Sequence, residues 1–457
     1  MIPELTTLPD PQRHGEHDRM RPIRRASPFR PLPLLLLLLL AQPLLAQDLP
    51  RARPEDVGMS SERLERLTAT FNRYVADGQL AGGVVLIARR GKVAYFEAFG
   101  MRDREARAPM TTDAIFRIAS QTKALVSVAV MMLQEEGKLA INSPVGMYLP
   151  EFQKTTVAVR RADGDGYDVV PARRPITIRD LLTHTAGIGY GYGIARDRWA
   201  EAGIQGWYFA DRDEPMAAVV QRMAALPFDA QPGERFVYGY ATDILGVLVE
   251  RVSGVSLDEF LRTRIFEPLK MRDTHFFLPP SKRDRLAVVY SAREDGGIER
   301  APDPGGMVGQ GAYVDGPRKA FSGGAGLVST ASDYARFLQM LLNGGELDGV
   351  RLLSPKTVEL MTADHIGERY GRPGEGFGLG FSVVKDLGAR GLPGSVGEFG
   401  WGGAYHSHYW VDPREELVVV YLTQLNPAGT IDDHAKLRAL VYQAIVDGGS
   451  RAGGPAT

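Results

Sequence analysis

Apolar and polar positions alternate along the chain in patterns that predict both helices and strands. Residues 60–77 carry apolar side chains three and four positions apart, which predicts an amphipathic helix. Two β-rich runs follow, at 82–90 and 93–102, separated by Gly91-Lys92, a combination typical of a hairpin. We therefore expect a helix and then a hairpin to open the folded domain.

A third pattern begins near residue 122 and predicts an apolar helix that ends close to Gly137. Its apolar face is broad and consists of Ala124, Leu125, Val128, Ala129, Met132 and Leu133. Because so much of its circumference is apolar, we expect this helix to be largely buried and rigidly held.

The last third of the chain returns to strand-like patterns. The strand-like runs are 377–385, 404–411 and 417–424. An amphipathic helix is predicted over 432–446. Residues 52–140 and 320–447 thus supply elements suited to one sheet, and the helical, loop-rich segment 141–319 is predicted to be an insert.

The first residues have the pattern of an export signal. Arginines precede the apolar run 32–40, and a cleavage candidate follows at Ala46-Gln47, so we assign 1–46 to a signal region with an expected natural start at Met20. The apolar run is too short for an ordinary membrane span, and an uncleaved anchor is the competing interpretation. We expect a periplasmic or secreted protein whose catalytic domain, 47–450, has no stable membrane span and ends in a disordered tail at 451–457.

Composition describes an ordinary soluble globular protein of 457 residues, with 44% hydrophobic and 24% charged residues. The formal net charge is −1, so nothing indicates nucleic acid as a partner. The chain has no cysteine, which excludes disulfides, thiolate metal sites and cysteine nucleophiles. The length allows two or three domains or one large two-lobed domain.

The strongest candidate for chemistry is Ser120-Gln121-Thr122-Lys123, at the start of the third predicted helix. Residues three apart share a helix face, so the Ser120 hydroxyl and the Lys123 amine are expected to meet. A helix N-terminus also favours developing negative charge. This combination suits a serine nucleophile activated by an amine. On the motif alone, an N-cap serine beside a solvated lysine is the alternative.

A lysine used as a base needs help, because an ordinary amine is protonated at neutral pH. Tyr238, at the entrance of another predicted apolar helix, is a candidate proton carrier, although a core or rim tyrosine is the alternative. An oxyanion hole needs two N–H donors. We expect these from Ser120 and Ala404, the latter because Gly402-Gly403 lets a backbone edge approach a ligand.

Two further stretches are candidates for lining a cleft. Residues 187–193 alternate glycine with Ile188, Tyr190 and Tyr192, which favours either a cleft loop or an ordinary surface loop. His406 and His408 would share one face of a strand, but no third ligand is evident, so we expect cleft lining rather than zinc. We expect no metal and no cofactor.

Taken together, these motifs resemble the serine β-lactamase and penicillin-binding-protein superfamily, with a class C-like arrangement. The matching stretches are Ser120–Lys123, 181–187, 232–238, 322–330 and Trp401-Gly402-Gly403. The resemblance spans about residues 52–447. It implies an α/β (α+β) fold in which an antiparallel sheet flanked by helices adjoins an all-helical lobe. It also implies that Ser120 is acylated, that Lys123 and Tyr238 are the general base pair, and that the N–H groups of Ser120 and Ala404 form the oxyanion hole.

The chain departs from the superfamily pattern at two motifs. Tyr238-Gly239-Tyr240 stands where an asparagine usually occupies the third position, and Trp401-Gly402-Gly403 replaces a Lys-Thr/Ser-Gly motif. The Trp-Gly-Gly motif is similar to that of the family VIII carboxylesterases. The resemblance therefore implies a serine hydrolase that cleaves carboxylic esters of small molecules. Tyr240, Trp401, Gly402 and Gly403 are its expected substrate-binding residues, together with Tyr190, Tyr192 and His406.

Other functions use the same groups. A β-lactamase, or an amidase or peptidase acting on D-amino-acid substrates of the cell-wall type, has this machinery, and a non-catalytic penicillin-binding-like sensor would lack turnover. An α/β-hydrolase is excluded because the sequence contains no G-x-S-x-G elbow. A small-molecule ester or amide is the expected substrate in each catalytic case.

Overall fold

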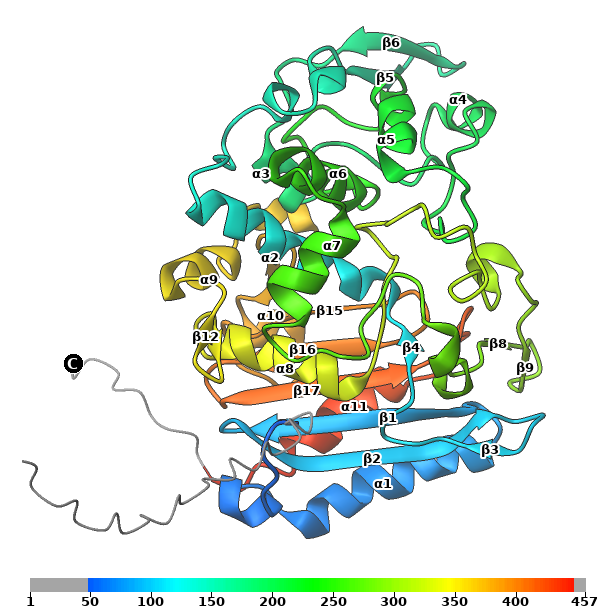
Figure 1. Cartoon of the computed structure of the whole chain (residues 1–457), viewed down its shortest axis with the longest axis vertical. Helices are drawn as coiled ribbons and strands as arrows, with labels where there is room; N and C mark the ends of the chain where they lie inside the picture. The colour runs from blue at the N-terminus through cyan, green and yellow to red at the C-terminus, as the bar shows by residue number, and fades with distance from the viewer. Residues whose placement is uncertain (1–47, 448–457) are drawn as a thin grey trace, which may run out of the picture. The chain divides into compact units, whose positions relative to one another are not determined.

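A sheet built from both ends of the chain forms the base of the computed structural model, which describes residues 48–447 (Figure 1). The sheet has eight strands in the order β13-β14-β15-β16-β17-β1-β2-β3, and neighbours pair antiparallel. The strands are β1 (Gly82–Arg89), β2 (Lys92–Asp103), β3 (Ala108–Pro109), β13 (Glu375–Phe377), β14 (Ser382–Val384), β15 (Phe399–Gly402), β16 (His408–Asp412) and β17 (Leu417–Thr423). The predicted sheet from both chain ends is confirmed.

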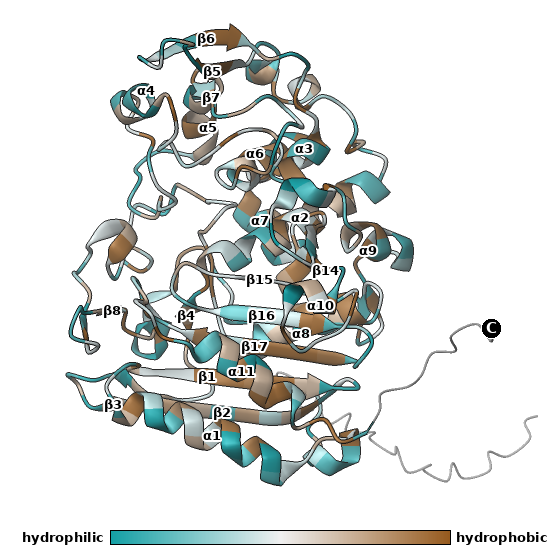
Figure 2. Cartoon of the chain, turned by 180° about the vertical axis from the view of Figure 1, so that it is seen from behind, coloured by the Kyte–Doolittle hydropathy of each residue, from teal (hydrophilic) through white to brown (hydrophobic). Residues whose placement is uncertain are grey.

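Helices cover both faces of this sheet. They are α1 (Ser61–Ala76) and α11 (Asp433–Tyr442) on one face, and α2 (Thr122–Glu135) and α8 (Ala331–Leu342) on the other. Alternate residues of β1 point to opposite faces, so Val85 and Ile87 join the core beneath α1 and α11, while Val84 and Leu86 join the core beneath α2 and α8. Seen from behind in Figure 2, α11 crosses β17 and β1. Because both faces are covered, every residue of β1 is buried.

The predicted first helix and hairpin are confirmed as α1, β1 and β2. The side chain of Ser60 accepts a hydrogen bond from the Arg63 N–H and caps α1. The buried residues of α1 are Leu64, Leu67, Phe71 and Tyr74, as the spacing predicted. Helix α2 is buried from Thr122 to Leu133, so it is a central helix rather than a surface one.

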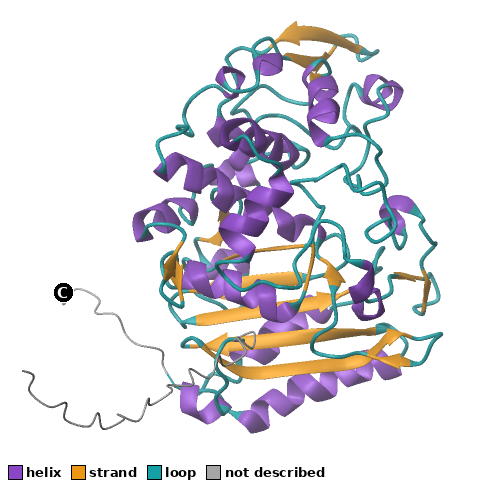
Figure 3. Ribbon diagram, in the orientation of Figure 1, coloured by secondary structure: helices purple, strands orange, loops and turns teal. Residues whose placement is uncertain are grey.

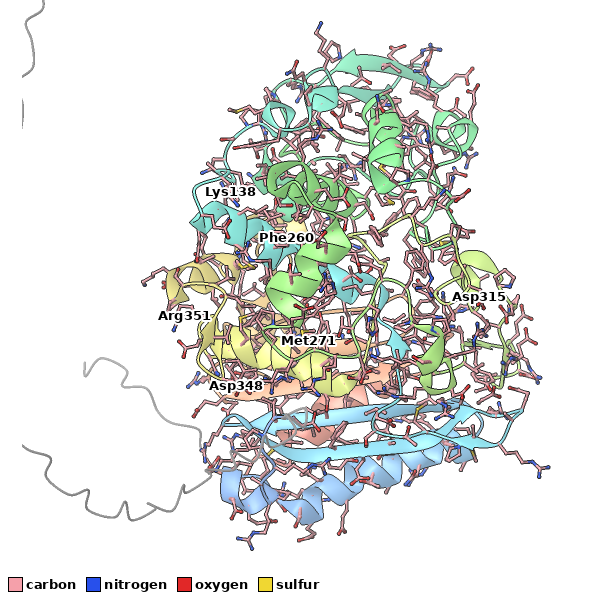
Figure 4. The ribbon with its side chains drawn as sticks, viewed as in Figure 1. Lys138, Phe260, Met271, Asp315, Asp348 and Arg351 are labelled. Atoms are coloured by element: carbon pink, nitrogen blue, oxygen red, sulfur yellow. The ribbon has the colours of Figure 1, made fainter. Side chains whose placement is uncertain are left out.

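The segment between the two sheet-forming parts is mainly helices and loops (Figure 3). Its helices are α3 (Ile178–Leu182), α4 (Arg196–Glu201), α5 (Met216–Ala224), α6 (Ala241–Ser253) and α7 (Leu257–Leu261), and α6 packs against α2. Phe260 of α7 and Met271 are buried there, whereas Lys138 and Arg351 carry their charges at the surface (Figure 4). The fold is thus the expected mixed α/β arrangement with a helical insert.

Short elements complete the chain. They are β5 (Thr156–Arg160), β6 (Tyr167–Pro171) and β7 (Pro227–Phe228) in one small sheet, the pairs β4 (Phe116–Arg117) with β10 (Val328–Ser329), β8 (Tyr290–Ala292) with β9 (Ile298–Arg300) and β11 (Glu346–Leu347) with β12 (Val350–Arg351), and helices α9 (Pro355–Met361) and α10 (Leu387–Arg390). The β4–β10 pair lies immediately before Ser120 and anchors the chain there, because the Ile118 N–H donates to the Leu327 carbonyl at 3.0 Å.

Two strand predictions were wrong in extent. The run 404–411 is not one strand: residues 403–407 form a turn, and only from His408 does β16 begin. The turn is closed by the Gly403 N–H donating to the Ser407 carbonyl at 2.8 Å, and His406 adopts a φ of 67°. The run 377–385 is likewise interrupted between β13 and β14, where Gly380 has a φ of 98°.

Within residues 48–447 no helix is both long enough and apolar enough to cross a membrane. The expected export signal within 1–46 and the expected tail at 451–457 lie outside the described residues.

Candidate active site

Ser120 and Lys123 meet at the start of α2, as their spacing predicted. Ser120 lies in a single turn of 3-10 helix, Ala119–Gln121, that leads into α2, and Ala119 before it has a φ of 42°. Residues other than glycine rarely adopt that conformation, and such strain is found at functional sites. The Lys123 Nζ lies 3.3 Å from the Ser120 Oγ. Both side chains are almost entirely buried, so water competes little for this contact.

Lys123 has two further partners that hold its amine in place. It donates to the Gly324 carbonyl at 2.7 Å, and its Nζ lies 3.1 Å from the hydroxyl of Tyr190. With Ser120 these contacts number three, so the amine has partners on several sides. The amine is therefore fixed next to the serine hydroxyl.

Tyr238 reaches the site but bonds a different partner. Its hydroxyl accepts a hydrogen bond from the Trp401 Nε1 at 3.0 Å, and the Lys123 Nζ lies over its ring, 4.7 Å from the centroid. The ring also packs against His184 at a centroid distance of 4.8 Å. Burial, with Lys123 nearby, lowers the pKa of His184 well below 6.5, so this histidine is a neutral packing partner.

Tyr190 is the tyrosine whose hydroxyl meets Lys123, although the sequence placed it only among the cleft-lining residues. Burial raises the pKa of Tyr190 well above 10, and neighbouring Tyr238 and Asp243 raise it further. Lys123, Tyr190 and Tyr238 therefore lie together beside Ser120, and the two tyrosine rings pack edge to face at a centroid distance of 5.7 Å.

The expected oxyanion donors share one cavity with the nucleophile. Ser120 and Ala404 both line it, and among residues 48–447 neither N–H has a hydrogen-bond acceptor in the protein. Gly403 lets the turn approach: a β-carbon there would lie 2.4 Å from the Ser407 Oγ and 2.5 Å from the Ile118 carbonyl oxygen. The N–H groups of Ser120 and Ala404 therefore remain predicted donors to an oxyanion, and both residues line the same cavity.

The cavity next to Ser120 has a volume of about 490 Å³. It brings together most of the predicted substrate-binding residues, namely Tyr190, Trp401, Gly402, Gly403 and His406, with Tyr238. Trp207, which the sequence analysis did not single out, adds another aromatic wall and packs against Tyr405 at a centroid distance of 5.5 Å. The only sequence signal for Trp207 is the glycine before it, in a loop of the insert.

Two predicted substrate-binding residues lie elsewhere. Tyr240 is fully buried, and its hydroxyl donates to the Gly206 carbonyl at 2.7 Å, because its position just before α6 directs it into the helical core. Tyr192 is 57% exposed and does not line the cavity. Tyr240 instead supports the loop of Tyr190, whose carbonyl also accepts from its hydroxyl at 3.3 Å.

His406 lies at the rim of the cavity in a cluster of polar side chains. Its Nε2 lies 2.7 Å from the Oδ1 of buried Asp433, whose other oxygen accepts from the Tyr421 hydroxyl at 2.7 Å. His406, Asp433 and His434 offer ligand atoms within 4.8 Å of one another. The imidazoles of His406 and His434 are stacked at an interplanar angle of 14°, however, and their Nε2 atoms already have hydrogen-bond partners. Hydrogen bonding accounts for this cluster without a metal.

Comparison with known proteins shows the family of the chain. The family model described as Beta-lactamase matches residues 67–443. The chain belongs to the β-lactamase family. Protein Rv1367c of Mycobacterium tuberculosis is 38% identical over 373 residues, which cover 79% of this chain and 90% of the relative. Esterase EstB of Burkholderia gladioli is 36% identical over 379 residues, covering 78% of this chain and 89% of EstB.

Among solved structures, that of EstCE1, described as a hydrolase with promiscuous acyltransferase activity, is similar to this member of the β-lactamase family. It matches with a TM-score of 0.73 and 30% sequence identity, covering 83% of this chain and 99% of EstCE1.

Proposed function

We propose that the protein is a serine carboxylesterase that forms an acyl-enzyme on Ser120. The observation that carries this proposal is Trp401, whose indole lines the cavity where the superfamily usually has a lysine. The indole N–H is already committed to the hydroxyl of Tyr238 at 3.0 Å. A planar, uncharged wall suits a neutral ester, and the relatives EstB and EstCE1 are named an esterase and a hydrolase.

The contacts support a two-step cycle. The Ser120 hydroxyl gives its proton to Lys123, and the oxygen attacks the ester carbonyl carbon, so that the carbonyl oxygen becomes an oxyanion facing the N–H groups of Ser120 and Ala404. As the tetrahedral intermediate collapses, the bond to the alcohol oxygen breaks. The proton that Lys123 took from Ser120 then passes through Tyr238 to the departing alcohol. Water then attacks the acyl-enzyme, which releases the acid and restores Ser120.

Anionic β-lactams should be poorer substrates. The lysine and asparagine of the usual motifs are absent, and each lost charge-assisted hydrogen bond weakens binding by about 1–3 kcal/mol. Arg372 also lines the cavity, 5.9 Å from the Trp401 ring, but its side chain is 64% exposed and lies 3.9 Å from Glu375. Water and this carboxylate screen its charge, so it replaces a buried lysine poorly.

Acyl transfer to an alcohol is a second candidate function, because EstCE1 is described with promiscuous acyltransferase activity. It needs only that an alcohol replace water in the second step. Product analysis by mass spectrometry with added methanol distinguishes the two outcomes: ester formation shows transfer, and free acid alone shows hydrolysis.

The test of the proposed function compares p-nitrophenyl esters of increasing acyl length with nitrocefin. We expect kcat/KM for the best ester to exceed that for nitrocefin by at least about 100-fold. Ser120→Ala should abolish ester hydrolysis. Ser127→Ala is the matched control, because Ser127 is a buried serine two turns further along α2 and should leave activity intact. Preferential nitrocefin hydrolysis would instead identify a β-lactamase, and an amide substrate series would identify an amidase.

Export to the periplasm or the outside of the cell is a further part of the proposal. It is supported by the arginines and apolar run of residues 21–46. N-terminal sequencing of the protein from a host with a secretory pathway tests it. A mature N-terminus near Gln47 supports export, and an intact N-terminus in the cytosolic fraction contradicts it.

A further inference from the structure

A buried carboxylate lies behind the catalytic lysine. Asp243 of α6 is 1% exposed, and its Oδ1 accepts hydrogen bonds from the Ser322 hydroxyl at 2.6 Å and from the Gly324 N–H at 3.0 Å. Both bonds end on Oδ1, an arrangement that an ionised carboxylate can make. Within the part of the chain that the structure describes, no ion pair satisfies this carboxylate. Burying a charge without an ion pair lowers the stability of the fold, so a carboxylate at this position is expected to have a function.

Hydrogen bonds connect Asp243 to Lys123 without a break. The Ser322 hydroxyl donates to Asp243, and its oxygen accepts from the Ala325 N–H at 3.2 Å. That N–H belongs to the peptide group whose carbonyl, Gly324 O, accepts from the Lys123 Nζ at 2.7 Å. A carboxylate, a hydroxyl, a peptide group and an amine are thus joined in sequence, and each member polarises the next.

Glycines hold this chain of groups together. A β-carbon on Gly324 would lie 2.4 Å from the Asp243 Oδ2, and one on Gly323 would lie 2.5 Å from the Thr242 carbonyl oxygen. The loop can therefore pack directly on α6 only because these positions lack side chains. This close approach places the Gly324 carbonyl within hydrogen-bond distance of the Lys123 Nζ.

The charges around Asp243 come from few groups. Burial raises the pKa of Asp243, and Lys123 is the cation that opposes this rise. Burial raises the pKa of Tyr190 and of Tyr240, and the charge of the nearby Asp243 carboxylate raises each further, so both phenols remain neutral. His184 is neutral as well. A positive charge on Lys123 therefore interacts favourably with the Asp243 carboxylate.

We propose that Asp243 is a positioning residue that orients Lys123 through Ser322 and the 324–325 peptide and stabilises the positive charge that Lys123 gains when it takes the proton of Ser120. It has the place that the third member has in other nucleophile–base–orienter arrangements. This inference rests on the proposed function, because it needs Lys123 to be the base.

Asp243→Asn tests the inference, because the amide oxygen can still accept hydrogen bonds but carries no charge. For p-nitrophenyl ester hydrolysis we expect kcat to fall about 10- to 100-fold with little change in KM. The base acts only when unprotonated, and a nearby carboxylate favours its protonated form. Removing the carboxylate should therefore move the acid limb of the kcat/KM profile to lower pH, by on the order of one unit.

Ser322→Ala should act in the same direction, because it breaks the connection and leaves Asp243 in place. The double variant should lose no more activity than the poorer single variant, since both changes interrupt one chain. Asp333→Asn is the matched control: Asp333 is a buried aspartate that also accepts from one hydroxyl and one N–H, those of Thr274 and Asp273, away from Lys123. It should leave the pH profile unchanged.

Two results would overturn the inference. One is an Asp243→Asn enzyme with wild-type kcat and an unmoved acid limb. The other is a loss in Asp243→Asn that matches only the loss of folded protein measured by circular dichroism. If Asp243→Asn does not fold, the pH profile of Ser322→Ala decides alone. Failure of the proposed function is distinguishable, because the wild-type protein would then hydrolyse no p-nitrophenyl ester.

Discussion

Replacing Tyr190 and Tyr238 in turn by phenylalanine separates two roles that the sequence assigned to one tyrosine. The Tyr190 hydroxyl lies 3.1 Å from the Lys123 Nζ, whereas the Tyr238 hydroxyl accepts from Trp401 at 3.0 Å. Both rings line the cavity. Phenylalanine keeps each ring and its packing, so the variants remove little beyond one hydroxyl. Tyr192→Phe is the matched control, because its side chain is largely exposed.

The expected losses differ in size. Without the Tyr190 hydroxyl, Lys123 loses one hydrogen bond to a charged group, about 1.5–3 kcal/mol, which corresponds to about 10- to 100-fold in kcat/KM. Without the Tyr238 hydroxyl, the bond from Trp401 contributes about 0.5–1.5 kcal/mol, and the lost proton transfer adds about 10²- to 10⁴-fold. We therefore expect Tyr238→Phe to be the more damaged enzyme.

The assay is stopped-flow hydrolysis of p-nitrophenyl butyrate, in which the burst reports acylation and the steady state reports turnover. Tyr238→Phe should slow the burst itself, because Tyr238 forms the general base pair with Lys123 that removes the Ser120 proton; p-nitrophenolate leaves readily without a proton donor. A larger loss in Tyr190→Phe than in Tyr238→Phe would refute this assignment and make Tyr190 the proton carrier. Equal, small losses in both would refute a tyrosine relay altogether.

Other positions give independent predictions. Gly403→Ala forces the turn of Ala404 away from its close neighbours, so kcat should fall at least about tenfold with a smaller change in KM, as steady-state kinetics can show. Trp401→Phe keeps an aromatic wall but removes the N–H bonded to Tyr238, and kcat should fall by about 2- to 10-fold in the same assay. Burial, with a nearby lysine, lowers the pKa of His275 to about 4, so the folded state takes up this proton less readily than the unfolded state. The unfolding free energy should therefore fall between pH 6.5 and 4, and urea titrations should show a shallower fall in His275→Gln; parallel curves would contradict this.

Short-range chemistry was accessible from the sequence. The meeting of Ser120 and Lys123 follows from a spacing of three residues at the start of a helix, and the structure shows it. The first helix and hairpin follow from apolar periodicity and a turn signal at Gly91-Lys92, although the turn itself is Arg90-Gly91 and Lys92 already begins β2.

Longer-range chemistry was not accessible in the same way. The contact of Tyr190 with Lys123 joins residues 67 positions apart and depends on how a loop of the insert packs over α2. The chain from Asp243 to Lys123 likewise combines α6, a glycine loop and α2. In the sequence, Asp243 is one acidic residue in an apolar helix. Its connection to Lys123 becomes evident only when the three elements are packed together in the structure.

The strand prediction over 404–411 failed for a local reason. Tyr405 and its neighbours have strand-like character, but the backbone turns there, with His406 in a left-handed conformation and no glycine inside residues 404–407 to announce it. The hydrogen bond from the Gly403 N–H to the Ser407 carbonyl closes this turn and offsets the cost of the left-handed conformation of His406. This turn carries the Ala404 N–H, the second predicted oxyanion donor. The strand prediction therefore failed at the donor whose position depends on tertiary packing.

The most direct test of the acyl-enzyme mechanism is mass spectrometry of the protein after reaction with a fluorophosphonate. We expect one adduct per chain, mapped to Ser120 by peptide sequencing, equal labelling of Ser127→Ala, and none of Ser120→Ala. Labelling that persists in Ser120→Ala, or an unlabelled wild-type enzyme that still hydrolyses esters, would contradict a nucleophilic Ser120.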